Sequence, residues 1–459
     1  MGGGCDAARW SLDNVTQFRI TALLFGSLAA AVCFGSARAE EANFLADLFR
    51  TITSGSATPP AANQAASPSG TSGHPLMTPE AIADAAANFS NCLERLWPDA
   101  SRRGVSRATF DTYALSQTPD LKIMEFMDTQ PEFTKSFWDY LDLLVTDARI
   151  EKGREVLAQN RAVFDAVEKA YGVDRYIIAA IWGVESNFGT SGGERPVIRS
   201  TATLACIGRR QDYFREEFLS TLEILHRNDV RPERLKGSWA GAFGPTQFMP
   251  TAFKRFAVDF DGDGRRDVVD SVPDMVASTA NNLKKDGWVP TQTWGYEVVV
   301  PDGFDFALAD RSRQMTVGEW EQLGIRRAGD KLFPRQADRG YLLVPAGARG
   351  PGFLMLNNFR VIMKYNPSEA YALAIGHLAD RMRGSAPFVQ EWPRDERVLT
   401  RFERYELQQL LAGRGYDVGN PDGQLGGKTR SAIRRFQAST GEVADGFASG
   451  AVLERLRSR

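Results

Sequence analysis

The sequence contains few of the side chains on which zinc enzymes and redox proteins depend. Its 459 residues include three histidines and four cysteines. His74, His226 and His377 lie far apart, and neither a C-x-x-C pair nor an HExxH helix occurs. These absences argue against a zinc enzyme and against a small fold stapled by disulfides. We therefore expect any chemistry to run on carboxylates, amides and hydroxyls.

The chain also lacks a strong charge of either sign. Its formal net charge is −2, and 43% of its residues are hydrophobic while 24% are charged. This balance is typical of globular proteins with a sizeable core, and it argues against a basic nucleic-acid binder or a polyacidic tail protein. The length allows roughly three domains of about 150 residues each.

The N-terminal segment contains an uncharged run from Ile20 to Phe34, which is shorter than the roughly 20 residues that span a membrane. Arg19 precedes the run, and Ala37-Arg38-Ala39 follows it. This pattern predicts a signal peptide over residues 1–39, with an uncleaved anchor as the alternative. Cleavage would leave two cysteines, Cys92 and Cys206, which are disulfide candidates in an oxidising compartment or, alternatively, two buried thiols.

The rest of the chain divides by composition. Residues 40–77 are predicted to be a disordered linker, because positions 54–75 are rich in Ser, Ala, Pro and Gly and carry no Asp, Glu, Lys or Arg. Residues 78–386 show mostly helical periodicity, with strand-like stretches at 297–300, 341–344 and 354–363. Prolines then mark a second linker, 387–397. A helical block of net charge +3 closes the chain at 398–459. The fold class predicted is mainly α (α+β).

The segment RYIIAAIWGVESN, residues 175–187, predicts a helix buried on nearly all sides. Glu185 would lie in its last turn, where the negative end of the helix dipole and apolar surroundings both disfavour the carboxylate anion. Both effects raise the pKa, as a general acid requires. The alternative is a structural ion pair with Arg195 or Arg199.

The segment GSWAGAFGPTQFMP, residues 237–250, predicts an irregular loop because it contains three glycines and two prolines. Its uncharged polar side chains, Ser238, Thr246 and Gln247, alternate with aromatic residues. This combination suits a sugar better than a charged ligand. A purely structural turn is the alternative.

The segment DFDGDGRRDVVD, residues 259–270, matches much of a calcium-binding loop. Gly264 allows the sharp turn, and Arg265 would contribute its backbone carbonyl. Carboxylates occupy positions 1, 3, 5 and 12 of the motif: Asp259, Asp261, Asp263 and Asp270. The last of these replaces the usual glutamate with a shorter side chain, so weak affinity is expected. A surface loop rich in Asx turns is the alternative.

Four segments in this order resemble the membrane-bound lytic transglycosylase B family of bacterial peptidoglycan-cleaving enzymes: YGVDRYIIAAIWGVESNFG, GSWAGAFGPTQFMP, DFDGDGRRDVVD and YNPSEAYALAIGHLADR. The resemblance covers about residues 78–385. It implies a lysozyme-like catalytic domain with an EF-hand-like calcium loop and a small β subregion. Together with the predicted signal peptide, it indicates a periplasmic location at the cell wall.

The same resemblance assigns roles to individual residues. Glu185 would be the sole catalytic acid, and the aspartates of residues 259–270 with Arg265 would hold a structural Ca²⁺. Six residues would bind substrate: Tyr140, Ser238, Gln247, Tyr365, Asn366 and Tyr371. One position departs from the family, because Asn282 stands where members can carry a cleft tyrosine, which puts one sugar-stacking contact in doubt.

The C-terminal block resembles a second unit, the peptidoglycan-binding domain type 1, which is a small helical bundle. The resemblance rests on motifs such as PDGQLG at 421–426 and TRSAI at 429–433. Binding is expected at the loop around Asp422 and Gly423. The predicted partners are peptidoglycan glycan strands and other cell-wall enzymes, with no nucleic acid, and the chain is expected to be a monomer.

The reaction implied is cleavage between N-acetylmuramic acid and N-acetylglucosamine. Glu185 would protonate the glycosidic oxygen and then remove the proton of the C6 hydroxyl, which attacks C1 and forms a 1,6-anhydromuramoyl product. Two alternatives remain at this point. One is a lysozyme-type hydrolase with a second carboxylate, and the other is a wall-binding protein without catalysis.

Overall fold

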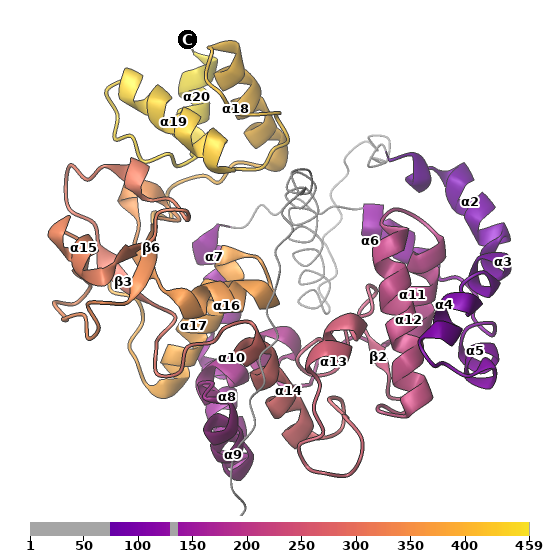
Figure 1. Ribbon diagram of the computed structural model, residues 1–459. Helices are drawn as coiled ribbons and strands as arrows, with labels where there is room; N and C mark the ends of the chain where they lie inside the picture. The colour runs from indigo at the N-terminus through magenta and orange to yellow at the C-terminus, as the bar shows by residue number, and fades with distance from the viewer. Residues whose placement is uncertain (1–73, 129–135, 459) are drawn as a thin grey trace, which may run out of the picture. The chain divides into compact units, whose positions relative to one another are not determined.

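The computed structural model describes residues 74–128 and 136–458 (Figure 1). The predicted signal peptide and nearly all of the first linker lie outside these residues. The described chain is mainly helical with a small antiparallel β region, as predicted. Within the described ranges, every helix is too short or too polar to cross a bilayer.

The helices carry the labels of Figure 1. In the first half of the chain they are α2 (Pro79–Ala87), α3 (Phe89–Glu94), α4 (Trp97–Arg102), α5 (Arg107–Tyr113), α6 (Lys122–Asp128), α7 (Phe137–Leu144), α8 (Asp147–Gln159), α9 (Arg161–Tyr171), α10 (Arg175–Ser186), α11 (Val197–Cys206) and α12 (Gln211–Arg227). In the second half they are α13 (Pro250–Phe256), α14 (Val272–Lys285), α15 (Val317–Gln322), α16 (Asn357–Tyr365), α17 (Glu369–Arg383), α18 (Arg401–Gly413), α19 (Gly427–Ser439) and α20 (Gly450–Arg457). Three 3₁₀ turns complete the set: η1 (Pro75–Met77), η2 (Phe306–Leu308) and η3 (Gly347–Arg349).

The central helix α10 forms where the sequence predicts it, and local signals set its ends. The Asp174 side chain accepts the N–H of Tyr176 at 2.9 Å and caps the first turn. Asn187, with a φ of +49°, ends the helix in the left-handed conformation. Every residue from Ile177 to Ser186 is buried. The helix therefore runs through the largest hydrophobic core, beside α8, α9, α14 and α17.

A second core joins α11 and α12 to the short helices α2–α6. Cys92 on α3 and Cys206 at the end of α11 form a disulfide across it, with their Cα atoms 6.0 Å apart. Of the two alternatives considered for these cysteines, the structure has the disulfide, which is the form that an oxidising compartment favours.

The β region is a five-stranded antiparallel sheet in the order β4-β6-β7-β3-β5. The strands are β3 (Gly295–Val299), β4 (Met315–Thr316), β5 (Arg326–Arg327), β6 (Arg339–Leu343) and β7 (Gly352–Met355). In the central register, Leu354 of β7 pairs with Tyr296 of β3 and Leu342 of β6. Two further short strands, β1 (Arg195–Pro196) and β2 (Lys236–Gly237), pair with each other.

Two elements differ from the sequence-based expectation. The predicted strand at 354–363 ends at Met355, and the chain continues as α16, because a short apolar run fits a buried helix face as well as a strand. Within the region of helical periodicity, the apolar pattern runs without a break through residues 137–157, yet this stretch forms two helices, α7 and α8. Thr146 separates them, since its side chain accepts the N–H of Arg149 and caps α8.

The C-terminal block is a three-helix unit, α18–α20, around its own core, as predicted. A buried side chain organises its loop. Gln408 accepts the N–H groups of Asp422 and Gly423 at 2.9 and 2.7 Å, and it donates to the side chain of Asp422. The loop proposed for binding is therefore held in one conformation by the core of the unit.

Candidate active site

Glu185 lies in the last turn of α10, and its side chain is almost completely buried, with 3% exposure. The hydroxyl of Tyr371, on α17, donates to Oε1 at 2.8 Å. The two arginines considered as partners are engaged elsewhere: Arg195 pairs with Asp120, and Arg199 donates to the carbonyls of Thr118 and Pro119. Within the described residues, Glu185 thus has a neutral hydrogen-bond donor and no ion pair.

This environment favours the protonated acid. Burial raises the pKa of Glu185 to about 8, although the hydrogen bond from Tyr371 acts in the opposite direction. The position at the C-terminal end of α10 adds to the effect, because the helix dipole is negative there. A carboxyl group that holds its proton near neutral pH has the property that general acid catalysis requires.

Three tyrosines lie around this acid, of which Tyr140 and Tyr371 are buried and Tyr365 is partly buried. Tyr140 comes from α7, Tyr365 from the end of α16 and Tyr371 from α17. Burial raises the pKa of each of them, and the negative charge of an ionised Glu185 raises it further. The structure therefore gathers residues more than 200 positions apart in sequence around one carboxyl group.

The loop at 237–250 lies against the end of α10. Ser186, next to the acid, donates to the carbonyl of Pro245 at 2.6 Å. The Tyr365 hydroxyl also donates to the loop, to the carbonyl of Thr246 at 2.5 Å. The loop turns tightly at its start, where a Cβ on Gly237 would lie 1.9 Å from the carbonyl oxygen of Ala242. Side chains from α10 and α16 thus fix the loop beside Glu185.

Gln247 is held in an unusual conformation. Its φ is +52°, in the left-handed region that non-glycine residues rarely adopt. Its Nε2 donates to the carbonyls of Gly192 and Gly244 at 3.0 and 2.9 Å. Its Oε1 is buried and has no partner among the described residues. An unpaired buried acceptor is costly, so this oxygen is suited to accept a hydrogen bond from a bound ligand.

The other two predicted substrate-binding residues have structural contacts in this state. The Ser238 hydroxyl accepts the N–H of Ala242 at 3.0 Å and is buried inside the loop. Asn366 is buried, and its Oδ1 accepts the N–H of Ser368 at 3.2 Å in the turn between α16 and α17. Both side chains therefore shape the backbone around the site.

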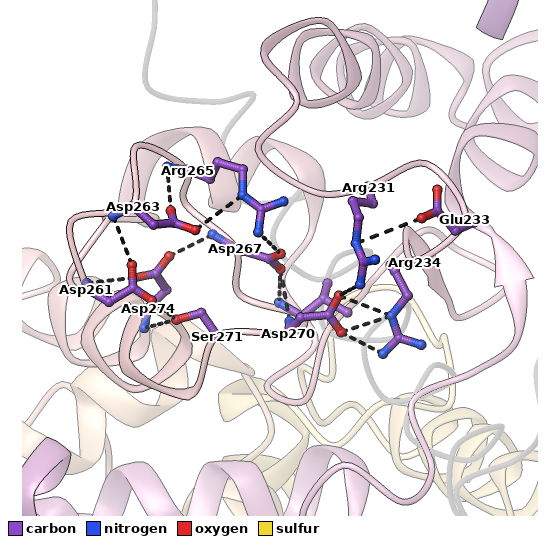
Figure 2. Close-up of polar contacts among 11 residues, drawn as sticks. Arg231, Glu233, Arg234, Asp261, Asp263, Arg265, Asp267, Asp270, Ser271 and Asp274 are labelled. Carbon is purple, nitrogen blue, oxygen red and sulfur yellow. Dashed lines mark hydrogen bonds and ion pairs between the residues drawn. The ribbon is translucent and has the colours of Figure 1, made fainter.

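The acidic loop at 259–270 brings three carboxylates together, two of which, Asp261 and Asp263, are labelled in Figure 2. Asp259, Asp261 and Asp263 each offer an oxygen, and these oxygens lie within 4.8 Å of one another. Backbone N–H groups orient them: Asp259 accepts from Gly262 and Gly264 at 2.7 and 2.8 Å. Three exposed carboxylates in this arrangement fit a hard divalent cation such as Ca²⁺.

Asp270 lies apart from this triad (Figure 2). Its carboxylate accepts from Arg231 at 2.8 Å and from Arg234 at 2.7 and 2.9 Å. This placement departs from the predicted ligand set, because two guanidinium groups occupy both oxygens of the short side chain. Asp274 holds the loop instead, since its oxygens accept the N–H groups of Phe260, Asp261 and Asp267.

The family model of the transglycosylase SLT domain matches residues 88–380, which is more than half of the chain. The chain belongs to the transglycosylase SLT family. A model of a peptidoglycan-binding domain matches residues 401–456. Both predicted resemblances are confirmed, and the chain is a lytic transglycosylase with a lysozyme-like catalytic domain.

Individual relatives agree with this assignment. SltB3 from Pseudomonas aeruginosa, solved in complex with NAG-anhNAM-pentapeptide, is 44% identical, with a TM-score of 0.78 over 80% of this chain and 99% of that one. The membrane-bound lytic murein transglycosylase B of Escherichia coli is 29% identical over 315 residues, which are 64% of this chain and 82% of that protein. The Escherichia coli transglycosylase Slt35, in complex with calcium, is 26% identical, with a TM-score of 0.53 over 64% and 92% of the two chains.

In this SLT transglycosylase, sequence reasoning missed the residues that support the site from nearby. Ser186 carries the link from α10 to the loop, and its position next to Glu185 is the signal that could have found it. Asp274 lies four residues beyond the calcium motif. The Ser271-x-x-Asp274 spacing, in which Ser271 caps α14, marks it as a residue of the first helical turn.

Proposed function

We propose that this chain cleaves the β-1,4 bond between N-acetylmuramic acid and N-acetylglucosamine, with Glu185 acting first as acid and then as base. The observation that carries the proposal is a buried carboxyl group that accepts a hydrogen bond from the Tyr371 hydroxyl. Burial raises the pKa of this group to about 8, which suits a general acid near neutral pH. SltB3, which is 44% identical, has been solved with NAG-NAM-pentapeptide and with NAG-anhNAM-pentapeptide. An uncleaved and an anhydro sugar in such a relative support transglycosylation over hydrolysis.

The first step uses the proton of Glu185. It is transferred to the glycosidic oxygen as the bond to C1 breaks, and the acetamido group of the substrate stabilises the positive charge at C1. The carboxylate left behind stays close to the Tyr371 hydroxyl, which stabilises the anion through the hydrogen bond at 2.8 Å.

The second step returns the proton to Glu185. The carboxylate accepts it from the C6 hydroxyl, and the C6 oxygen forms a bond to C1, so the 1,6-anhydro ring closes and no water is consumed. The free Oε1 of Gln247 would accept a hydrogen bond from a hydroxyl or amide of the sugar. The tyrosines around Glu185 would supply apolar ring surface and exclude water.

We further propose a structural Ca²⁺ at Asp259, Asp261 and Asp263, with the backbone carbonyl of Arg265 as an additional ligand. The donor set is all oxygen, as calcium prefers, and Slt35 has been solved in complex with calcium. The cation would offset two of the three negative charges and stiffen the loop that leads into α14.

The C-terminal unit is proposed to hold the enzyme on the glycan, through the loop around Asp422 and Gly423. The match to the peptidoglycan-binding model supports this role. A cleaved signal peptide at residues 1–39 and a periplasmic location are part of the same proposal, because the substrate lies outside the cytoplasm.

The test is mass spectrometry of purified peptidoglycan digested by the full-length protein. Transglycosylation predicts muropeptides lighter by one water than hydrolysis products, and borohydride leaves their anhydro ends unchanged. Reducible ends of the heavier mass would establish a hydrolase and overturn the proposed second step. A digest without soluble products would overturn the proposal altogether.

A further inference from the structure

The segment between the two family matches is packed against the catalytic domain. We call residues 387–397, predicted above as a linker, the strap. The Glu297 carboxylate on β3 accepts the N–H of Val389 at 2.9 Å and the N–H of Gln390 at 2.7 Å. The Gln390 side chain donates to the carbonyl of Val298 at 2.8 Å. These bonds fix the first half of the strap against β3.

Aromatic side chains continue this contact. The Phe388 ring packs edge-on against Phe353 of β7, with ring centres 4.9 Å apart. Trp392 stacks on Phe353 at 6.0 Å and contacts Trp138 of α7 at 5.9 Å. Phe353 and Trp138 are both buried. Trp392 therefore connects the sheet to α7 through two core residues.

A charged pair adds a second link to the same helix. The Arg394 guanidinium donates to both oxygens of Asp142, at 2.6 and 3.2 Å. Asp142 lies on α7, one turn beyond Trp138. Because both side chains of this ion pair are exposed, we expect it to stabilise the position of α7 less than the packing of Trp392 does.

α7 carries Tyr140 and has little stability of its own. It is eight residues long, and helices of this length form only when tertiary contacts support them. Trp138 and Tyr140 are two positions apart, so they point to different sides of the helix. One side contacts the strap. The other side packs against α17, so that Tyr140 lies in the same core cluster as Tyr371, whose hydroxyl donates to Glu185.

We propose that the strap is a positioning segment of the active site, in which Trp392 and Arg394 hold α7 so that Tyr140 stays beside Glu185. The inference rests on the proposed function, because it assigns the strap a role in that reaction. It also places the functional end of the catalytic domain beyond residue 386.

The experiment measures kcat/KM of full-length variants on purified glycan strands, well below their melting temperatures. Trp392→Ala is expected to lower kcat/KM at least tenfold. Trp392→Phe keeps an aromatic ring at this position and should lower kcat/KM less than threefold. Arg394→Ala should lose about threefold. The matched control is Arg349→Ala. It removes the ion pairs from Arg349 to Asp395 and Glu396 of the strap but leaves the contacts to α7 intact, and its kcat/KM should stay within twofold of wild type.

A double mutant separates positioning from general stability. If the strap acts through Tyr140, Trp392→Ala adds less than twofold loss when Tyr140 is already alanine. An undiminished tenfold loss in that background, or a folded Trp392→Ala enzyme within twofold of wild type, would overturn the inference. If Trp392→Ala fails to fold, Arg394→Ala in the two backgrounds decides. The product mass from the wild-type digest tests the proposed function separately.

Discussion

Two regions of this protein depend on carboxylates and place them in opposite environments. At the end of α10, Glu185 is buried without an ion pair and is bonded to the Tyr371 hydroxyl. In the loop at 259–270, several aspartates lie at the surface and are surrounded by backbone N–H groups and arginines. The first environment retains a proton, and the second retains negative charge.

The pKa values express this contrast. Burial raises that of Glu185 to about 8. The pKa of Asp270 lies below its usual range. Partial burial alone would raise it, but the hydrogen bonds and charges of Arg234 and Arg231 outweigh that effect. The same functional group is therefore suited to proton transfer in one place and to ionic contacts in the other.

The largest effect is expected from removal of the buried acid. Glu185→Gln keeps the size of the side chain but has no proton to donate, so we expect cleavage to fall by about 10³-fold or more. Release of soluble muropeptides measures it, and sedimentation with purified cell wall checks that binding is retained. Asp270→Asn is the matched control for loss of a carboxylate elsewhere. Lytic activity retained by Glu185→Gln would contradict the assignment.

The pH dependence tests the environment of the acid. Because the proton must be present, kcat/KM should fall as the pH rises through about 8. The hydrogen bond from Tyr371 lowers this pKa, so Tyr371→Phe should move the alkaline limb to higher pH. Tyr341→Phe, a change at another buried tyrosine, should leave the limb in place. An alkaline limb that Tyr371→Phe leaves unchanged would contradict the proposed contact.

The same shift has a consequence for stability. The pKa of Glu185 is raised in the folded state above its unfolded value, so the folded protein binds the extra proton between about pH 4.5 and 8. Its contribution to the free energy of unfolding therefore decreases as the pH rises through this window. Glu185→Gln, which does not titrate, should remove that decrease in thermal melts.

The acidic loop should respond to calcium. After removal of metal with EDTA, added Ca²⁺ should release or absorb heat and raise the melting temperature. At a Ca²⁺ concentration of 100 times the dissociation constant, the free energy of unfolding should increase by about 2.7 kcal/mol. Asp261→Asn removes one of the three converging carboxylates and should weaken binding at least tenfold. Absence of heat and of a melting shift in the wild-type protein would refute a calcium site.

The sequence could predict the buried acid because that prediction needs only local information. An apolar run from Ile177 to Val184 is enough to place Glu185 inside a helix core. The three tyrosines around it come from distant helices, and only the family resemblance indicated them. The strap was predicted as a linker because prolines interrupt it, whereas its packing depends on Trp138, more than 250 positions upstream.

The motif at 259–270 shows the limit of spacing rules. They identify Asp259, Asp261 and Asp263, whose oxygens do converge. They also select Asp270. A local motif contains no information about the two arginines, 36 and 39 positions upstream, that bind this carboxylate in the structure. Contacts with a distant segment therefore determine that Asp270 pairs with two arginines, while the other three aspartates converge on one another.

The smallest effect on calcium affinity is expected from substitution of Asp270. This test decides whether Asp270 is an ion-pair partner or a metal ligand. Asp270→Asn should change the affinity for Ca²⁺ by less than about threefold, because its oxygens face Arg231 and Arg234. It should lower stability by about 1 kcal/mol or less, as is usual for exposed ion pairs. Calorimetric titration beside Asp261→Asn measures the contrast. An equal loss of affinity in both variants would show that Asp270 binds the cation, and the distinction drawn between the two carboxylates would fall.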